Sequence, residues 1–411
     1  MINSHDRDII QKLASEVAEI AALPIQQEKK RLWKKLNALR PERPMVMIEQ
    51  VCWNEMNVDD ELTLRCQDDE CRSYENLLRM TLYQWKHFPV DKVIEPIVHV
   101  PKAVKNTGFG FEIEQDIAVG DPTNGVVGHG YINQFKTDAD LDKIKKPIVT
   151  HDEAETARRL EKARELFGDT LTINCDGYTP YLSVWDPIST WMSVEDALYA
   201  LIDRPEYIQE MVRRMVAGYM SMLDQMEELG LLPTHQPVIH CTGAYTDELP
   251  VPDCNPVKSR TQNIWMSSQA QMLGTVSPDM FQDFEITPNL PLFERFGRVY
   301  YGCCEPLDRY MDQVRQIPNL RKISMSPWTD EENGAREIRG DYVFSRKPNP
   351  ALLAWDSFDE KAIRTHLQTT VDICREHGCP LELILKDLST VRYDPQRLWR
   401  WAEIAMEIVE K

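Results

Sequence analysis

The sequence predicts an α/β protein, a (β/α)8 or TIM barrel with an N-terminal helical extension and a β-hairpin insertion. From residue 171 onward, short segments rich in Val, Ile, Leu and Tyr alternate with segments of helical periodicity, the order expected of a parallel sheet with helical connections. Neither a Gly-x-Gly-x-x-Gly nor a Walker sequence occurs, which disfavours a nucleotide-binding sheet. The length of 411 residues fits one barrel with insertions.

The composition excludes several classes of partner. A net charge of −19 disfavours nucleic acid and anionic membrane surfaces, because both need a positive protein surface. The first residues lack the basic and apolar order of a signal peptide, and no apolar run approaches the ~18 residues of a membrane span. We therefore expect a cytoplasmic protein. Its ten cysteines are too sparse for a disulfide scaffold, so reduced thiols are expected.

Two helices precede the barrel. Apolar residues recur at helical spacing between residues 6 and 40, and Pro24 interrupts them. We assign residues 1–43 to a helical extension that covers the barrel or contacts a second subunit, and residues 44–411 to the barrel. The first elements of the barrel are expected to be a strand at 44–52, a helix at 74–87 and a strand at 90–101.

A β-hairpin is expected as an insertion at about residues 105–137. Two segments alternate between polar and apolar residues on either side of a Gly-Asp-Pro-Thr-Asn-Gly turn at 120–125. A helix at 152–167 leads to a strand at 171–176 and an aromatic loop at 177–186. We expect the hairpin and the loop to enclose a pocket.

The rest of the chain continues the alternation of helices and strands. Helices are expected from Ser193 and from Pro205, the second ending near Gly230. The later elements are a strand at 238–243, helices at 265–273 and from Ser277, strands at 299–305, 320–326, 341–347 and 381–387, helices at 308–316 and 359–377, and a Trp-rich terminal helix.

Soft metal ligands lie at two of these strand ends. The strand at 299–305 ends on Cys303, Cys304 and Glu305, and the segment 238–243 carries His240. Imidazole, thiolate and carboxylate are zinc ligands, and a catalytic zinc keeps one position open. By strand alternation Cys303 and Glu305 share one face and Cys304 takes the other. Either thiol is therefore a possible ligand beside His240 and Glu305, and Cys241 is expected to point away from them.

The alternative to this zinc site is structural. In that interpretation His240 is a hydrogen-bonded pocket residue, and the two adjacent cysteines pack in the core.

Other strand ends and loops supply further candidate pocket residues. Arg346 and Lys347 form the one basic pair at a strand end, which suits a substrate carboxylate or phosphate, or else a salt bridge to Asp387 or Glu305. Lys386 is a candidate general acid if burial lowers its pKa. The remaining candidates are Asp176 and Tyr178 for catalysis and Tyr181, Trp185 and Trp328 for substrate binding.

Three segments carry a resemblance to a known family. They are residues 90–103 with a Val-Ile-x-x-Ile-Val-x-Val-Pro pattern, residues 177–206 with Gly-Tyr-Thr-Pro-Tyr-Leu and Asp-Arg-Pro-Glu, and Ser-Pro-Asp-Met-Phe at 277–281. On their order and spacing the chain is identified as a member of the uroporphyrinogen decarboxylase superfamily over most of residues 46–405. The resemblance implies a barrel with one deep pocket, often in a homodimer.

Within the superfamily, the sequence is most similar to the zinc-dependent methyltransferases that serve corrinoid proteins. That resemblance implies zinc, a small methylated substrate and a corrinoid protein as partner. Those enzymes use a His-x-Cys pair, whereas this chain has His240 directly before Cys241. The decarboxylases hold their porphyrinogen with arginines after the first strand, whereas this chain has Glu49 and Glu55 there, which would repel it. Decarboxylation of an aromatic or tetrapyrrole acid is therefore the alternative, and a non-catalytic barrel that binds a corrinoid protein or tetrapyrrole is the second.

Overall fold

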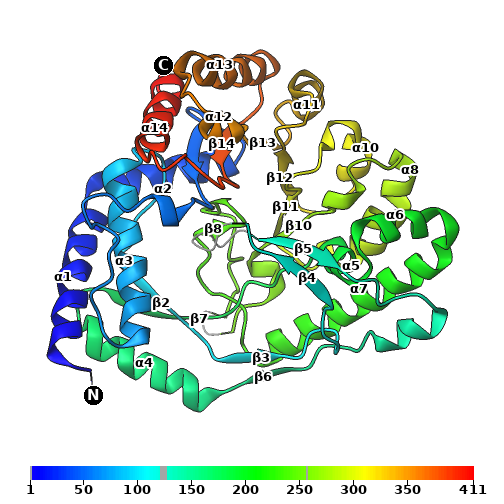
Figure 1. Ribbon diagram of the computed structural model, residues 1–411, viewed down its shortest axis with the longest axis horizontal. Helices are drawn as coiled ribbons and strands as arrows, with labels where there is room; N and C mark the ends of the chain where they lie inside the picture. The colour runs from blue at the N-terminus through cyan, green and yellow to red at the C-terminus, as the bar shows by residue number, and fades with distance from the viewer. Residues whose placement is uncertain (1, 121–126, 256–257) are drawn as a thin grey trace.

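Six parallel strands form the main sheet of the protein. The computed structural model describes residues 2–120, 127–255 and 258–411. The order in the sheet is β1-β14-β13-β12-β11-β10 (Figure 1). Its strands are β1 (Met45–Ile48), β10 (Trp265–Ser268), β11 (Arg298–Tyr301), β12 (Leu320–Met325), β13 (Val343–Arg346) and β14 (Leu381–Leu385). All five ladders are parallel, as expected for strands joined by helices.

A second parallel pair is separate from this sheet. Strand β2 (Ile97–Pro101) pairs with β7 (Thr172–Asp176). Within the described residues, no ladder joins this pair to either edge of the six-stranded sheet. The α/β class with a parallel sheet is therefore confirmed, while a closed barrel of eight strands stays a prediction.

The long helices occupy the positions that the sequence predicts. The long ones are α1 (Ser4–Ala21), α2 (Pro24–Asn37), α3 (Asp69–His87), α4 (Glu153–Phe167), α6 (Val194–Asp203), α7 (Pro205–Glu228), α13 (Glu360–His377) and α14 (Gln396–Val409). The short ones are α5 (Trp185–Met192), α8 (Pro278–Phe281), α9 (Thr287–Phe293), α10 (Met311–Val314), α11 (Glu331–Ile338) and α12 (Ala351–Ala354). Helix α1 packs on α3 and α4, and α2 packs on β1, so both helices of the extension contact the rest of the fold. In the part of the chain that is described, none of the helices has the length and apolar character to cross a membrane.

The predicted hairpin insertion is present. Strands β4 (Gln115–Ala118) and β5 (Gly128–Tyr131) pair in antiparallel register, and most of the turn expected at 120–125 lies outside the described residues. The segments around them, β3 (Val104–Asn106) and β6 (Val149–His151), pair with each other. Figure 1 shows the β4–β5 hairpin projecting across the middle of the molecule.

Two predictions about the later elements are wrong. Residues 265–273 do not form a helix, because β10 and a short 3-10 turn (Gln271–Leu273) occupy that range. Residues 238–243 do not form one strand. They form a tight antiparallel hairpin, β8 (Val238–Ile239) and β9 (Thr242–Gly243), in which Ile239 pairs with Thr242.

The β8–β9 hairpin lies inside the curved sheet, near the centre of Figure 1. Ile239 and Cys241 share one core cluster with Trp33 of α2, Trp265 of β10 and Tyr300 of β11. The side chains that pack against the hairpin thus come from strands on the inner face of the sheet. A helix residue and a hairpin thus cover the inner face of the sheet.

A buried ion pair fixes the hairpin in this interior. Lys322 of β12 donates to Glu382 of β14 at 2.7 Å, and both side chains are fully buried. The hydroxyl of Thr242 donates to Glu382 at 2.7 Å. Lys322 also donates to the Thr242 hydroxyl at 2.9 Å and to the carbonyl of Gly243 at 3.0 Å. Two strands of the sheet therefore hold one arm of the hairpin by charge-assisted hydrogen bonds.

Substitution of Glu382 tests the strength of this anchor. Glu382→Gln leaves the Lys322 ammonium buried without a counter-ion, which should lower the free energy of unfolding by about 3 to 5 kcal/mol, measured by urea denaturation. The matched control is Glu403→Gln, which removes a solvent-exposed partner of Arg400 and should cost less than about 1 kcal/mol. Equal losses in the two variants would contradict the assignment of Glu382 as an anchor.

Candidate functional site

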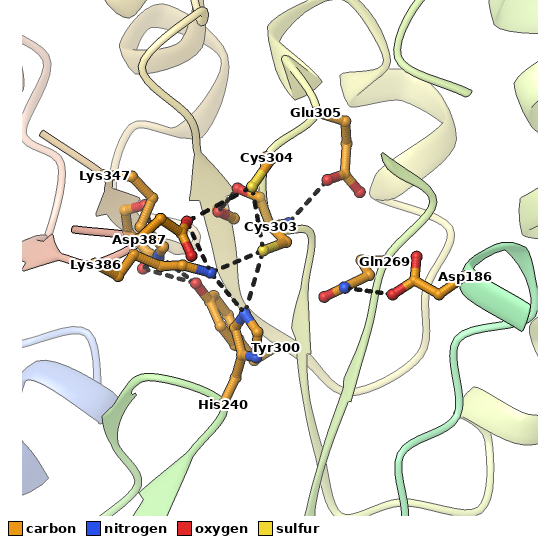
Figure 2. Close-up of polar contacts among 12 residues, drawn as sticks. Asp186, His240, Gln269, Tyr300, Cys303, Cys304, Glu305, Lys347, Lys386 and Asp387 are labelled. Carbon is orange, nitrogen blue, oxygen red and sulfur yellow. Dashed lines mark hydrogen bonds and ion pairs between the residues drawn. The ribbon is translucent and has the colours of Figure 1, made fainter. Parts of the chain in front are cut away.

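The sulfur of Cys303 is the centre of a polar cluster (Figure 2). The ammonium of Lys386 lies 2.9 Å from Cys303 Sγ, and His240 Nε2 lies 3.4 Å from it. The Sγ atom of Cys304 is 3.6 Å away. Cys303 itself is only 4% exposed. Side chains predicted at three separate strand ends, those of His240, Cys303 and Lys386, thus meet at one sulfur.

The chain after β11 turns sharply to present the two cysteines. Gly302 has a φ of 95°, and a Cβ there would lie 2.4 Å from Leu307, so both the conformation and the space require glycine. The carboxylate of Glu305 accepts from the amide of Cys303 at 2.9 Å and from the amide of Ala270 at 2.9 Å. The hydroxyl of Ser324 donates to the carbonyl of Cys303 at 2.8 Å. These bonds fix the backbone on both sides of the reactive sulfur.

His240 reaches the cluster from the tip of the β8–β9 hairpin. It is the first of two residues in the turn and has a φ of 53°, a left-handed conformation that is uncommon outside glycine. Its ring centroid lies 5.8 Å from that of Tyr300. Because the chain reverses at this point, the alternation of faces expected along one strand at 238–243 does not apply to His240. The turn directs the imidazole to Cys303, while Cys241 is buried in the interior cluster.

Lys386 and Asp387 follow β14 directly. Lys386 is 3% exposed, and its ammonium lies 3.4 Å from Asp387 Oδ2 and 3.4 Å from His240 Nε2. Asp387 Oδ2 is also 3.8 Å from Cys304 Sγ. The sulfur of Cys303 therefore has a cation on one side, and Cys304 connects it to a carboxylate on the other.

This environment favours the thiolate form of Cys303. A hydrogen bond from Cys304 is the main cause that lowers the pKa of Cys303; burial opposes it, and the His240 hydrogen bond and the charge of Lys386 reinforce it, to give a pKa of about 3. The same hydrogen bond, together with burial, raises the pKa of Cys304. Burial would lower the pKa of Lys386, but the neighbouring sulfurs of Cys241 and Cys303 raise it, which contradicts the predicted lowering. One thiolate and one ammonium thus stabilise each other.

The residues present do not form the predicted zinc site. Glu305 is buried, and Figure 2 shows its carboxylate bonded to the backbone of Cys303 and not to either sulfur. Burial raises the pKa of Glu305 to about 7. In the described ranges, no group of three or more His, Cys, Asp and Glu side chains is placed to hold a metal ion. The Lys386 ammonium already occupies a position beside Cys303 and His240. Zinc binding by His240, Cys303 and Cys304 therefore stays a prediction that requires Lys386 to move.

Arg346 and Lys347 do not act as a pair. Arg346 is buried and forms an ion pair with Glu331 of α11, so it joins β13 to a helix. Lys347 instead donates to the hydroxyl of Tyr300 and, at 2.8 Å, to the hydroxyl of Ser345. The predicted salt bridges to Asp387 or Glu305 are absent from the described pairs.

The other predicted residues lie apart from Cys303 in their contacts. Asp176 forms an ion pair with His99 on the neighbouring strand β2. Tyr181 donates to Asp186 and accepts from Gln269 at 2.7 Å. Tyr178 is half exposed, Trp328 is 73% exposed and Trp185 is fully buried. Their proposed roles in catalysis and substrate binding stay predictions.

Sequence reasoning missed two residues that complete the cluster. Tyr300 and Ser345 both accept from the predicted residue Lys347. The signal for Ser345 was available, because Ser345 and Lys347 are two residues apart on one strand and must share a face. The contact of Tyr300 with Lys347 depends on the register between strands, which the sequence does not show.

Comparisons with known proteins give little further information. No protein-family model and no curated protein sequence matches the chain. Among solved structures, a methyltransferase from Methanosarcina mazei is similar in chain path, with 11% identity and a TM-score of 0.48 over 92% of this chain and 97% of that one. A likeness this distant says nothing about activity.

The thiolate of Cys303 can be tested by its absorbance in the ultraviolet. With a pKa of about 3, Cys303 should keep one equivalent of thiolate at about pH 6, well below the ordinary thiol pKa of about 8.5, and lose it only when the pH falls through 3. Cys303→Ser should remove that signal. Cys304→Ala should move the titration toward the ordinary range, because it removes the largest stabilising hydrogen bond. A titration that is unchanged in Cys303→Ser would contradict the assignment.

A second test concerns the competition between Lys386 and a metal. An ammonium 2.9 Å from the sulfur competes for the same electron pair as a metal ion. We therefore expect Lys386→Met to bind zinc at least about tenfold more tightly than the unsubstituted protein, measured by competition with a chromophoric chelator. Adding Cys303→Ser should abolish the gain. Equal zinc affinity with and without Lys386 would show that the ammonium does not block the site.

Proposed function

We propose that this protein is an enzyme that transfers a methyl or other small alkyl group, with the Cys303 thiolate as the nucleophile. The observation that carries the proposal is the position of one buried sulfur 2.9 Å from an ammonium and 3.4 Å from an imidazole. Thiolates held by cations at neutral pH are the usual form of reactive cysteines. The location at the carboxyl end of a parallel strand is where α/β enzymes carry their chemistry.

The first step is a displacement at carbon. An electron pair of Cys303 Sγ forms a bond to the alkyl carbon, and the bond from that carbon to its oxygen, nitrogen or sulfur substituent breaks. The leaving atom takes the bonding electrons and needs a proton. Lys386 and His240 both lie within hydrogen-bond reach of the sulfur, so either group can deliver that proton across the site.

The surrounding residues hold the nucleophile in place. Glu305 and Ser324 bind the amide and the carbonyl of Cys303, so the sulfur can approach the alkyl carbon without reordering the backbone. Cys304 donates to the thiolate before reaction and, in this proposal, stays uncharged. Its role is to tune the nucleophile, since its own pKa is raised.

The resemblance of the sequence to corrinoid-linked methyltransferases supports a corrinoid protein as the alkyl acceptor. In the second step a Co(I) corrinoid would use its electron pair to form a cobalt–carbon bond, while the carbon–sulfur bond breaks and the Cys303 thiolate returns. The net charge of −19 fits a protein partner better than a polyanion. Zinc is proposed only as an addition to this scheme and carries none of its steps.

Turnover with methylated phenols, amines and thiols, with a reduced corrinoid protein as acceptor, tests this function. Cys303→Ser should lower the methylation rate by about a thousandfold or more, because it removes the nucleophile, whereas Cys304→Ala should lower it by about tenfold. Cys254→Ser, at a partly exposed cysteine bonded to Asn255, is the matched control. Full activity of Cys303→Ser would reject the nucleophile, and release of carbon dioxide without methyl transfer would support decarboxylation instead.

A further inference from the structure

The side chain of Lys347 carries a positive charge into the interior of the sheet. It follows β13 and shares the inner face of that strand with Val343 and Ser345, and Val343 belongs to the interior cluster around Trp33 and Tyr300. Lys347 is only 3% exposed. A lysine this deeply buried is uncommon unless it is paired with an acid.

The acceptors of Lys347 are uncharged oxygens. Its ammonium donates to the hydroxyl of Tyr300, to the hydroxyl of Ser345 at 2.8 Å and to the carbonyl of Ser345 at 3.4 Å. Across residues 2–120, 127–255 and 258–411, no carboxylate forms an ion pair with it. Hydrogen bonds to neutral groups satisfy its protons but do not neutralise its charge.

The other two lysines of the interior do have anionic partners. Lys322 is paired with Glu382 at 2.7 Å. Lys386 has the Cys303 sulfur at 2.9 Å and Asp387 at 3.4 Å. Among the described residues, Lys347 is therefore the one of these three lysines that has no anionic partner.

Lys347 is connected to the site around Cys303 through Tyr300 and His240. Tyr300, which accepts from Lys347, has its ring 5.8 Å from the ring of His240, and His240 contacts Cys303. Figure 2 shows Lys347, Tyr300 and Lys386 around the same part of the site. Two side chains, those of Tyr300 and His240, thus separate Lys347 from the Cys303 sulfur.

We propose that the site takes a substrate with a carboxylate group, which Lys347 binds while the reacting carbon faces Cys303. This inference rests on the proposed function and adds the substrate class to it. A single lysine with neighbouring hydroxyls suits one carboxylate, since phosphate sites usually gather several donors. Arg346 was predicted to bind the anion together with Lys347. In this proposal it does not bind the substrate, because it already forms an ion pair with Glu331.

Two alkylating reagents of the same reactivity class separate this inference from general thiol reactivity. Iodoacetate carries a carboxylate and iodoacetamide does not, and with each the sulfur–carbon bond forms as iodide leaves. The rate at Cys303, followed by peptide mass spectrometry, should favour iodoacetate over iodoacetamide about tenfold more than a small free thiol does. The ratio of the two rates removes effects on the nucleophile itself.

Three substitutions complete the experiment. Lys347→Met should lower the ratio about tenfold, and Lys347→Arg, which keeps the charge, should retain most of it. The matched control is Lys29→Met, because Lys29 is also buried and donates to backbone carbonyls, but on α2. An equal ratio in folded Lys347→Met, Lys347→Arg and unsubstituted protein would overturn the carboxylate site. An ordinary absolute rate at Cys303 would reject the reactive thiolate and hence the proposed function, independently of the ratio.

Discussion

The buried contact of Lys322, Glu382 and Thr242 is the constraint on which the candidate site depends. It places one arm of the β8–β9 hairpin against β12 and β14 in the interior. The other end of that short hairpin is the turn with His240, so the anchor and the imidazole are two residues apart. Glu382 and Lys386 follow the same inward-facing alternation along β14. One strand therefore both holds the hairpin and supplies the ammonium that meets His240 at Cys303.

The interior of the sheet contains three buried lysines. Lys322, Lys347 and Lys386 are all buried, although acidic residues predominate in the sequence. A carboxylate in place of any of them would compete with the thiolate through like-charge repulsion, which is strong where water is excluded. The low pKa of Cys303 has local causes, namely the hydrogen bond from Cys304, the hydrogen bond with His240 and the charge of Lys386. In the proposed reaction, Lys347 adds a positive group for an anionic part of the substrate.

The sequence predicts the strands that carry the candidate site residues at their ends, but it does not predict the conformation of the segments between them. Apolar runs located β11 and β14, and with them Cys303 and Lys386. His240 was assigned to a straight strand because the segment Val-Ile-His-Cys-Thr-Gly is β-prone and lacks a typical turn pair such as Asn-Gly. The chain reverses there because of tertiary contacts, namely the hydrogen bonds of Lys322 and Glu382 with Thr242. The helix expected at 265–273 is absent for a similar reason, because the burial of β10 in the sheet outweighs the local helical periodicity.

The position of Lys386 decides how the cysteine pair works. Of the two cations that can neutralise a thiolate, a metal ion would need several converging ligands, whereas an ammonium needs only the sulfur and its own hydrogen bonds. Glu305 is committed to the backbone amides of Cys303 and Ala270 and cannot turn to the sulfurs without releasing the loop. The fold thus uses the carboxylate of Glu305 to fix the loop and a lysine to hold the charge. In the proposed reaction, the ammonium that stabilises the sulfur would also supply the proton that the leaving group requires.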